Sequence, residues 1–110
     1  ISANVIRSAN GNEPLVSNNT NVVYRVPGAH TESGLPYIGT ANDLKVRTNT
    51  ANDGRDRNYA EVIGNYPAND RNARRVAEQN AINSNAGISR LDNKRNEIAE
   101  KKWGDKGVIF

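Results

Sequence analysis

Cysteine is absent from this sequence, and histidine occurs once, at His30. Without cysteine the chain has no disulfide framework, thiolate zinc site or cysteine nucleophile, and a single histidine excludes metal sites built from several. No apolar run approaches the roughly 18 to 20 residues that a bilayer-spanning helix needs, so no membrane-spanning segment is expected. Aromatic residues make up 5% of the chain and hydrophobic residues 35%. A chain of 110 residues therefore has apolar side chains for one modest core in a single domain.

Asparagine and charged residues are abundant in this sequence. Eighteen residues are asparagine, which favours turns and helix caps. Fifteen Lys and Arg against twelve Asp and Glu give a net charge of +3, a mild excess that favours a polyanionic partner. The arginines of the second half stand beside carboxylates, as on a solvated surface. There is no arginine-rich tail and no basic stripe interleaved with aromatics, so a passive single-strand binder is poorly supported.

The chain divides into a polar lead-in or linker over residues 1–20 and a single domain over residues 21–110. β-Branched and aromatic residues predict strands at 21–26, 35–39 and 59–66, and the first two are expected to form a loose hairpin. Pro36 indicates an edge strand or a strand start. Residues 40–47 predict a turn into a short helix, with Thr40 or Asn42 as its N-cap.

Two longer helices are predicted after the third strand. Asn69 or Asp70 is expected to cap the first, whose apolar spacing ends at a break over residues 83–87. The second is expected over residues 88–102, with Leu91 and Ile98 inward and residues 103–104 closing it. The order β-β-α-β-α-α predicts an α+β fold in which helices cover a three-stranded sheet that begins with the hairpin.

Residue types that phosphodiester chemistry uses recur along these elements. Tyr24 and Tyr37 fall on adjacent strands, where both hydroxyls can project from one face. Arg47 offers paired donors to phosphate oxygens. Glu78, in the middle of a helix, is a candidate oxygen ligand for a divalent cation, and Asn93 or Asn96 is a candidate to bind a phosphate or to hold another side chain. Each of these residues alone is also typical of an ordinary strand or helix surface.

The order of these residues resembles the signature of the GIY-YIG nuclease family. Residues 22–24 read Val-Val-Tyr, residues 37–39 read Tyr-Ile-Gly, and Arg47 lies ten residues after Tyr37. After the third strand, Glu78 stands where the family has a metal-binding glutamate on a helix. Asn93 follows fifteen residues later, with Asn96 as a neighbouring candidate. The resemblance covers about residues 22–96.

This resemblance implies an endonuclease that hydrolyses phosphodiester bonds. Glu78 would hold Mg²⁺ or Mn²⁺, Arg47 would pair with the phosphate, Tyr24 with Tyr37 would orient or deprotonate the water, and Asn93 would brace the site. The nucleic-acid backbone would be tracked by basic residues of the second half, namely Arg55, Arg57, Arg74, Arg75, Lys94 and Arg95.

Three departures from the family pattern are visible. The first triplet is Val-Val-Tyr rather than Gly-Ile-Tyr, and the linker between the two tyrosines is slightly long and holds His30. The His or Tyr that many members carry just after the helix arginine is missing, since residues 48–51 read Thr-Asn-Thr-Ala. The proton-handling group is therefore open, with His30 as a substitute.

Residues 52–57, 60–63 and 91–98 resemble the C-terminal toxin domains of Rhs and contact-dependent inhibition proteins. This second resemblance implies the variable tip of a larger secreted bacterial surface protein, acting in the target-cell cytoplasm. A cognate immunity protein would cover its basic cleft, so the domain would be a monomer or a toxin–immunity heterodimer. The start at Ile1 without Met fits a piece of a longer chain, and the absence of cysteine fits action in a reducing cytosol.

Two other functions stay open. One is a metal-independent RNase toxin in which His30 is the acid/base and an arginine or threonine binds the phosphate, leaving a 2′,3′-cyclic phosphate. The other is a non-enzymatic module whose arginines dock on nucleic acid or on an acidic protein. No base-specific element is present, so DNA and RNA are equally open as substrates.

Overall fold

The computed structural model describes residues 19–109 and has the predicted α+β fold. Its strands are β1 (Thr20–Val26), β2 (Tyr37–Asp43) and β3 (Glu61–Asn65), and its helices are α1 (Leu44–Thr50), α2 (Arg71–Ser84) and α3 (Trp103–Lys106). Four 3₁₀ turns lie between them, η2 (Gly28–His30), η3 (Arg57–Tyr59), η4 (Ile88–Arg90) and η5 (Glu100–Lys102). Residues 1–18 of the predicted lead-in lie outside the described residues, and Thr20 already belongs to β1.

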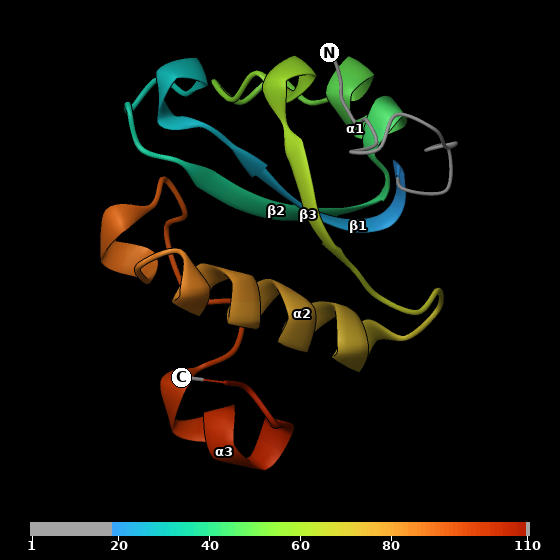
Figure 1. Ribbon diagram of the computed structural model, residues 1–110, viewed down its shortest axis with the longest axis vertical. Helices are drawn as coiled ribbons and strands as arrows, with labels where there is room; N and C mark the ends of the chain where they lie inside the picture. Colours follow the sequence, from blue (N-terminus) through green and yellow to red (C-terminus); the bar gives the residue numbers. More distant parts are fainter. Residues whose placement is uncertain (1–18, 110) are drawn as a thin grey trace, which may run out of the picture.

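The three strands form one antiparallel sheet in the order β2-β1-β3. The predicted hairpin is confirmed, with Val26 opposite Tyr37 and Tyr24 opposite Gly39. Figure 1 shows α1 and short turns on one side of the sheet, α2 on the other, and α3 beyond α2. Because β1 is central and covered on both faces, its residues from Val22 to Tyr24 are almost wholly buried.

Alternation along the strands divides the core between the two faces. The face toward α1 carries Val22, Tyr24, Val26, Ala41, Leu44 and Ala60. The face toward α2 carries Val23 and Ile38, which pack with Tyr66, Ile82 and Leu91. Thus Tyr37 of β2 lies on one face of the sheet and Ile38 on the other, and the following side chains of this edge strand alternate in the same way.

The boundaries of β2 and α1 differ from the prediction. Residues 40–43 continue the strand rather than turning into a helix, because they pair with β1 as far as Thr20 opposite Asp43. The N-cap of α1 is Asp43, whose carboxylate accepts hydrogen bonds from the backbone N–H groups of Lys45 and Val46, so neither Thr40 nor Asn42 fills this role. Asp70 caps α2 through the backbone N–H of Ala73, as predicted.

The predicted helix over residues 88–102 is wrong. This segment contains the turns η4 and η5 with irregular chain between them, and α3 begins at Trp103, where the helix was expected to close. Backbone N–H groups of this segment bond to acceptors elsewhere in the chain instead of to one another. The Gln79 side chain accepts from the Ile98 N–H at 2.9 Å, and the Asp92 N–H donates to Pro36 O at 2.7 Å. Leu91 and Ile98 are nevertheless buried, as predicted.

Candidate functional site

Tyr24 and Tyr37 lie together on the α1 face, with ring centroids 6.2 Å apart. Tyr24 is 0% exposed, and its hydroxyl accepts a hydrogen bond of 2.8 Å from Nε of Arg57. Gly39 lies directly opposite Tyr24, and a Cβ at this position would be 2.6 Å from the Tyr24 hydroxyl. The glycine of the Tyr-Ile-Gly triplet therefore leaves space for the Tyr24 side chain.

Arg57 is held between Tyr24 and Asp53. Its side chain is 3% exposed, and its two terminal nitrogens each donate to an Asp53 carboxylate oxygen at 2.8 Å. Burial acts to lower the pKa of Arg57, but the hydrogen bonds to Asp53 and Tyr24 outweigh it and hold the pKa above its ordinary value. The same hydrogen bond from Arg57 holds the pKa of Asp53 below its usual range. Arg57 is thus an internal ion-pair residue, a position that does not suit the predicted contact with a nucleic-acid backbone.

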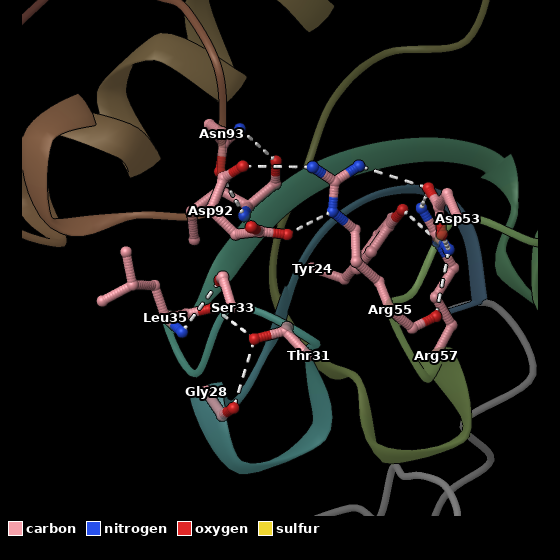
Figure 2. A network of polar contacts seen from close by, with 11 residues as sticks. Tyr24, Gly28, Thr31, Ser33, Leu35, Asp53, Arg55, Arg57, Asp92 and Asn93 are labelled. Carbon is pink, nitrogen blue, oxygen red and sulfur yellow. Dashed lines mark hydrogen bonds and ion pairs between the residues drawn. The ribbon is translucent and has the colours of Figure 1, made fainter.

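Arg55 extends this network to the segment after η4 (Figure 2). Its guanidinium lies 3.8 Å above the centre of the Tyr37 ring, and its Nε donates to Asp92 Oδ2 at 2.7 Å. It also bonds Asp53 at 3.2 Å and is mostly buried. The network therefore ties the polar stretch around residues 53–57 to the tyrosine pair and to residues 92–93.

Asn93 continues the network onto the exposed edge of β2. Its side-chain amide accepts from Ile38 N–H at 2.9 Å and donates to Ile38 O at 2.8 Å. Because β2 is an edge strand, this amide pairs with backbone groups as a further strand would. Asn93 thus braces the Tyr-Ile-Gly strand at Ile38. The neighbouring candidate Asn96 instead accepts from the buried Gln79 amide at 2.9 Å.

Glu78 lies on the opposite face, where α2 packs beneath β2. Its Oε1 accepts a hydrogen bond of 3.2 Å from the Thr40 hydroxyl and is 3.6 Å from Arg74 Nη1, which itself donates to Thr40 at 3.3 Å. The Glu78 side chain is 12% exposed. Burial, together with the negative charge of Glu97, raises the pKa of Glu78 to about 7, against the Thr40 hydrogen bond and the positive charges of Arg74 and Arg47. This carboxyl group therefore changes its protonation state near neutral pH.

The predicted catalytic residues consequently form two groups separated by the sheet. Tyr24 and Tyr37 lie toward α1, and Glu78 lies toward α2, with Arg47 exposed on α1 but within electrostatic reach of Glu78. Burial and the neighbouring Tyr24 raise the pKa of Tyr37, and the charge of Glu78 adds to the rise against the charge of Arg55.

His30 lies in η2, between β1 and β2. Its ring stacks on Tyr59 at 3.7 Å with an interplanar angle of 3°. It borders a hollow of about 350 Å³ whose other walls include Thr31, Asn52 and Arg55.

The remaining predicted basic contacts differ in their availability. Arg75 is engaged by Glu97, with Nε 2.9 Å from a carboxylate oxygen, whereas Lys94 and Arg95 are exposed. The sequence did not single out Asp53 or Asp92 as site residues, and it offered Thr40 only as a helix cap. Arg74 and Glu78 stand at the i,i+4 spacing typical of a helical ion pair.

Two absences apply to the described residues. Between residues 19 and 109, no three His, Asp or Glu side chains gather into a group that could hold a metal ion. Over the same range, no helix has the length and hydropathy to cross a membrane. Comparison of the chain with family models, curated proteins and solved structures gives no match.

Proposed function

We propose that this chain is a bacterial toxin domain that hydrolyses phosphodiester bonds in target-cell nucleic acid as a metal-dependent endonuclease. The observation that carries the proposal is the Glu78 carboxyl group, mostly buried between Thr40 and Arg74 with a pKa of about 7. A carboxyl group in such a setting is typical of functional sites. The ordered resemblance of Tyr24, Tyr37, Arg47, Glu78 and Asn93 to GIY-YIG nucleases supports the same reading.

Glu78 suits a cation that is held mainly by its substrate. Mg²⁺ in phosphoryl-transfer sites commonly takes one or two carboxylates, several waters and the substrate phosphate. A single carboxylate can therefore serve such a site, although residues 19–109 hold no larger acidic cluster. When bound, Mg²⁺ or Mn²⁺ would polarise the phosphate and stabilise the leaving oxygen. Glu78 is the residue that would hold it.

Two arginines whose charges act on Glu78 are suited to the phosphate. Arg74 is 3.6 Å from the Glu78 carboxylate, and Arg47 is exposed on α1 within electrostatic reach of it. Guanidinium groups donate paired hydrogen bonds to phosphate oxygens. Tyr24 is buried under Arg57, so we assign it to holding the α1-face network, whereas Tyr37 is only half-buried at the edge strand and is better placed to meet water.

The direct test is cleavage of plasmid DNA and of total cellular RNA by the purified chain in Mg²⁺. Glu78→Gln and Arg47→Ala should each reduce cleavage by about 100-fold or more, as for loss of a group that stabilises transition-state charge. Glu100→Gln, which neutralises an exposed carboxylate in η5, is the matched control and should cut as the wild type does. Full cleavage in EDTA, or by Glu78→Gln, would contradict the proposal.

A second candidate rests on the surroundings of His30. The stacked imidazole borders a hollow with Thr31 and Arg55, a set that suits the metal-independent RNase. In that case His30→Ala should abolish a cleavage that EDTA leaves intact, and the product should end in a 2′,3′-cyclic phosphate. His30→Ala retaining full cleavage would exclude it.

The toxin assignment has its own test in cells. Expression of the wild-type chain should arrest growth, and Glu78→Gln should be tolerated, whereas a non-enzymatic binding module would be tolerated in both forms. Co-expression of a cognate immunity protein should restore growth and yield a one-to-one heterodimer. Tolerance of the active chain without such a partner would argue against the toxin.

A further inference from the structure

Tyr66 stands directly after β3 and is the one buried tyrosine to which the proposed function gives no role. Its ring packs in the α2-face core with Val23, Ile38, Ile82 and Leu91, and the residue is 8% exposed. Its backbone N–H donates to Asn21 O at 3.1 Å, which fixes it beside the start of β1. The position of the side chain is thus set by both core and backbone.

The Tyr66 hydroxyl reaches across the sheet to β2. It donates to Asn42 Oδ1 at 3.4 Å, and Asn42 is exposed, so the hydroxyl lies at the rim of the core rather than inside it. Asn42 and Thr40 are two residues apart on β2 and project from the same face, about 7 Å from each other. Thr40 donates to Glu78, so Tyr66 and Glu78 each bond to a side chain of β2 on the same face, two residues apart.

The charges around Tyr66 are those around Glu78. Burial raises the pKa of Tyr66, Arg74 and Arg47 oppose this rise, and Glu78 adds to it. The hydroxyl is therefore protonated at neutral pH and acts as a hydrogen-bond donor. At 3.4 Å its bond to Asn42 is long, so its proton is easily redirected to a better acceptor.

We propose that Tyr66 is a further catalytic residue, whose hydroxyl donates a hydrogen bond to a non-bridging oxygen of the scissile phosphodiester beside Glu78, Arg47 and Arg74. This inference rests on the proposed nuclease function. No proton is transferred, since the hydroxyl replaces its bond to Asn42 by a charge-assisted bond to the phosphate. This bond strengthens as negative charge builds on the phosphate oxygens during attack by water.

The test is Tyr66→Phe, which keeps the ring in the core and removes only the hydroxyl. In Mg²⁺ we expect kcat to fall at least about tenfold, with KM and the midpoint of thermal unfolding close to wild type, because the lost bond matters most in the transition state. Tyr59→Phe removes an exposed hydroxyl, on a residue 52% exposed, and should leave kcat unchanged. A folded Tyr66→Phe that cuts at the wild-type rate overturns the inference, even if it melts earlier.

A second pair of variants tests the hydroxyl without touching the core. Asn42→Asp gives it a charged acceptor that holds its proton and should lower kcat, whereas Asn42→Ala should not. Asn65→Asp, at an exposed position of β3, adds the same charge elsewhere and controls for repulsion of the substrate. Equal rates for Asn42→Asp and Asn65→Asp overturn the role of Tyr66. A wild-type chain that cuts neither DNA nor RNA overturns the nuclease function itself, so the two failures are distinct.

Discussion

Among single residues, Gly39 is closely surrounded by two tyrosine side chains. An added Cβ would meet the Tyr24 hydroxyl at 2.6 Å and the Tyr37 ring at 2.8 Å, and Tyr24 is fixed by Arg57. The triplet Tyr-Ile-Gly is visible in the sequence, but the reason for its glycine is not, because Tyr24 comes to it from another strand.

We therefore expect Gly39→Ala to lower the free energy of unfolding by about 1–3 kcal/mol, as overpacking does in a buried site. Gly64→Ala in β3 is the matched control, since its Cβ would meet Val23 at an ordinary 3.7 Å. Urea denaturation of both variants measures the difference. Equal losses in the two would show that Tyr24 can move aside.

The protonation of Glu78 is a second property of one residue. Its folded pKa of about 7 lies above its ordinary 4.5, so the folded state binds more protons than the unfolded state between these values. Wild-type stability should therefore fall as pH rises from about 4.5 to 7, on the order of 2 kcal/mol, and Glu78→Gln should not show this loss. Urea unfolding of both proteins at pH 5 and pH 8 checks it. A constant difference between them would place the Glu78 pKa at its ordinary value.

At the scale of elements, α2 and the segment after it differ in what their sequences reveal. The cap and apolar spacing of α2 are local, so residues 70–84 are predicted nearly as observed. Residues 88–102 carry equally helical side chains, but their conformation depends on bonds to Gln79, Ile38 and Pro36. Those partners are distant in the sequence, so no local sequence pattern predicts these hydrogen bonds.

Gln79 is the clearest case, because it is 0% exposed and accepts the hydrogen bond of the Ile98 N–H. Gln79→Ala leaves that buried donor unpaired and should lower the free energy of unfolding by about 1–3 kcal/mol. Asn72→Ala, at an exposed position of the same helix, should change it by less than about 0.5 kcal/mol. Thermal unfolding of the two variants compares them, and equal midpoints would mean that the segment finds another partner for Ile98.

Over the whole molecule, the packing of helices on a three-stranded sheet could be predicted from the sequence. The separation of the predicted catalytic residues by that sheet could not. The predicted order of elements gives helices on a three-stranded sheet, but it does not show that Tyr37 lies toward α1 and Glu78 toward α2. Residues 48–58 are almost wholly polar, yet Arg55 and Arg57 turn inward, because Asp53 and Asp92 pair with their charges. Basic side chains that are exposed enough to contact nucleic acid therefore lie outside residues 48–58.

Lys94 and Arg95 remain exposed next to the brace at Asn93. If they contact phosphates, Lys94→Gln should weaken binding of a catalytically inactive Glu78→Gln chain to nucleic acid and reduce the slope of log affinity against log salt by about 0.7–0.9. Lys101→Gln in η5, toward the α3 end of the molecule in Figure 1, is the control and should leave the slope unchanged. Fluorescence anisotropy over a salt series measures both. An unchanged slope for Lys94→Gln would remove it from the interface.

The amide of Asn93 on β2 also bears on self-association. It occupies the hydrogen-bonding groups of Ile38 that another strand would use. A strand of a second copy can therefore pair with β2 at Ile38 only by displacing the Asn93 amide.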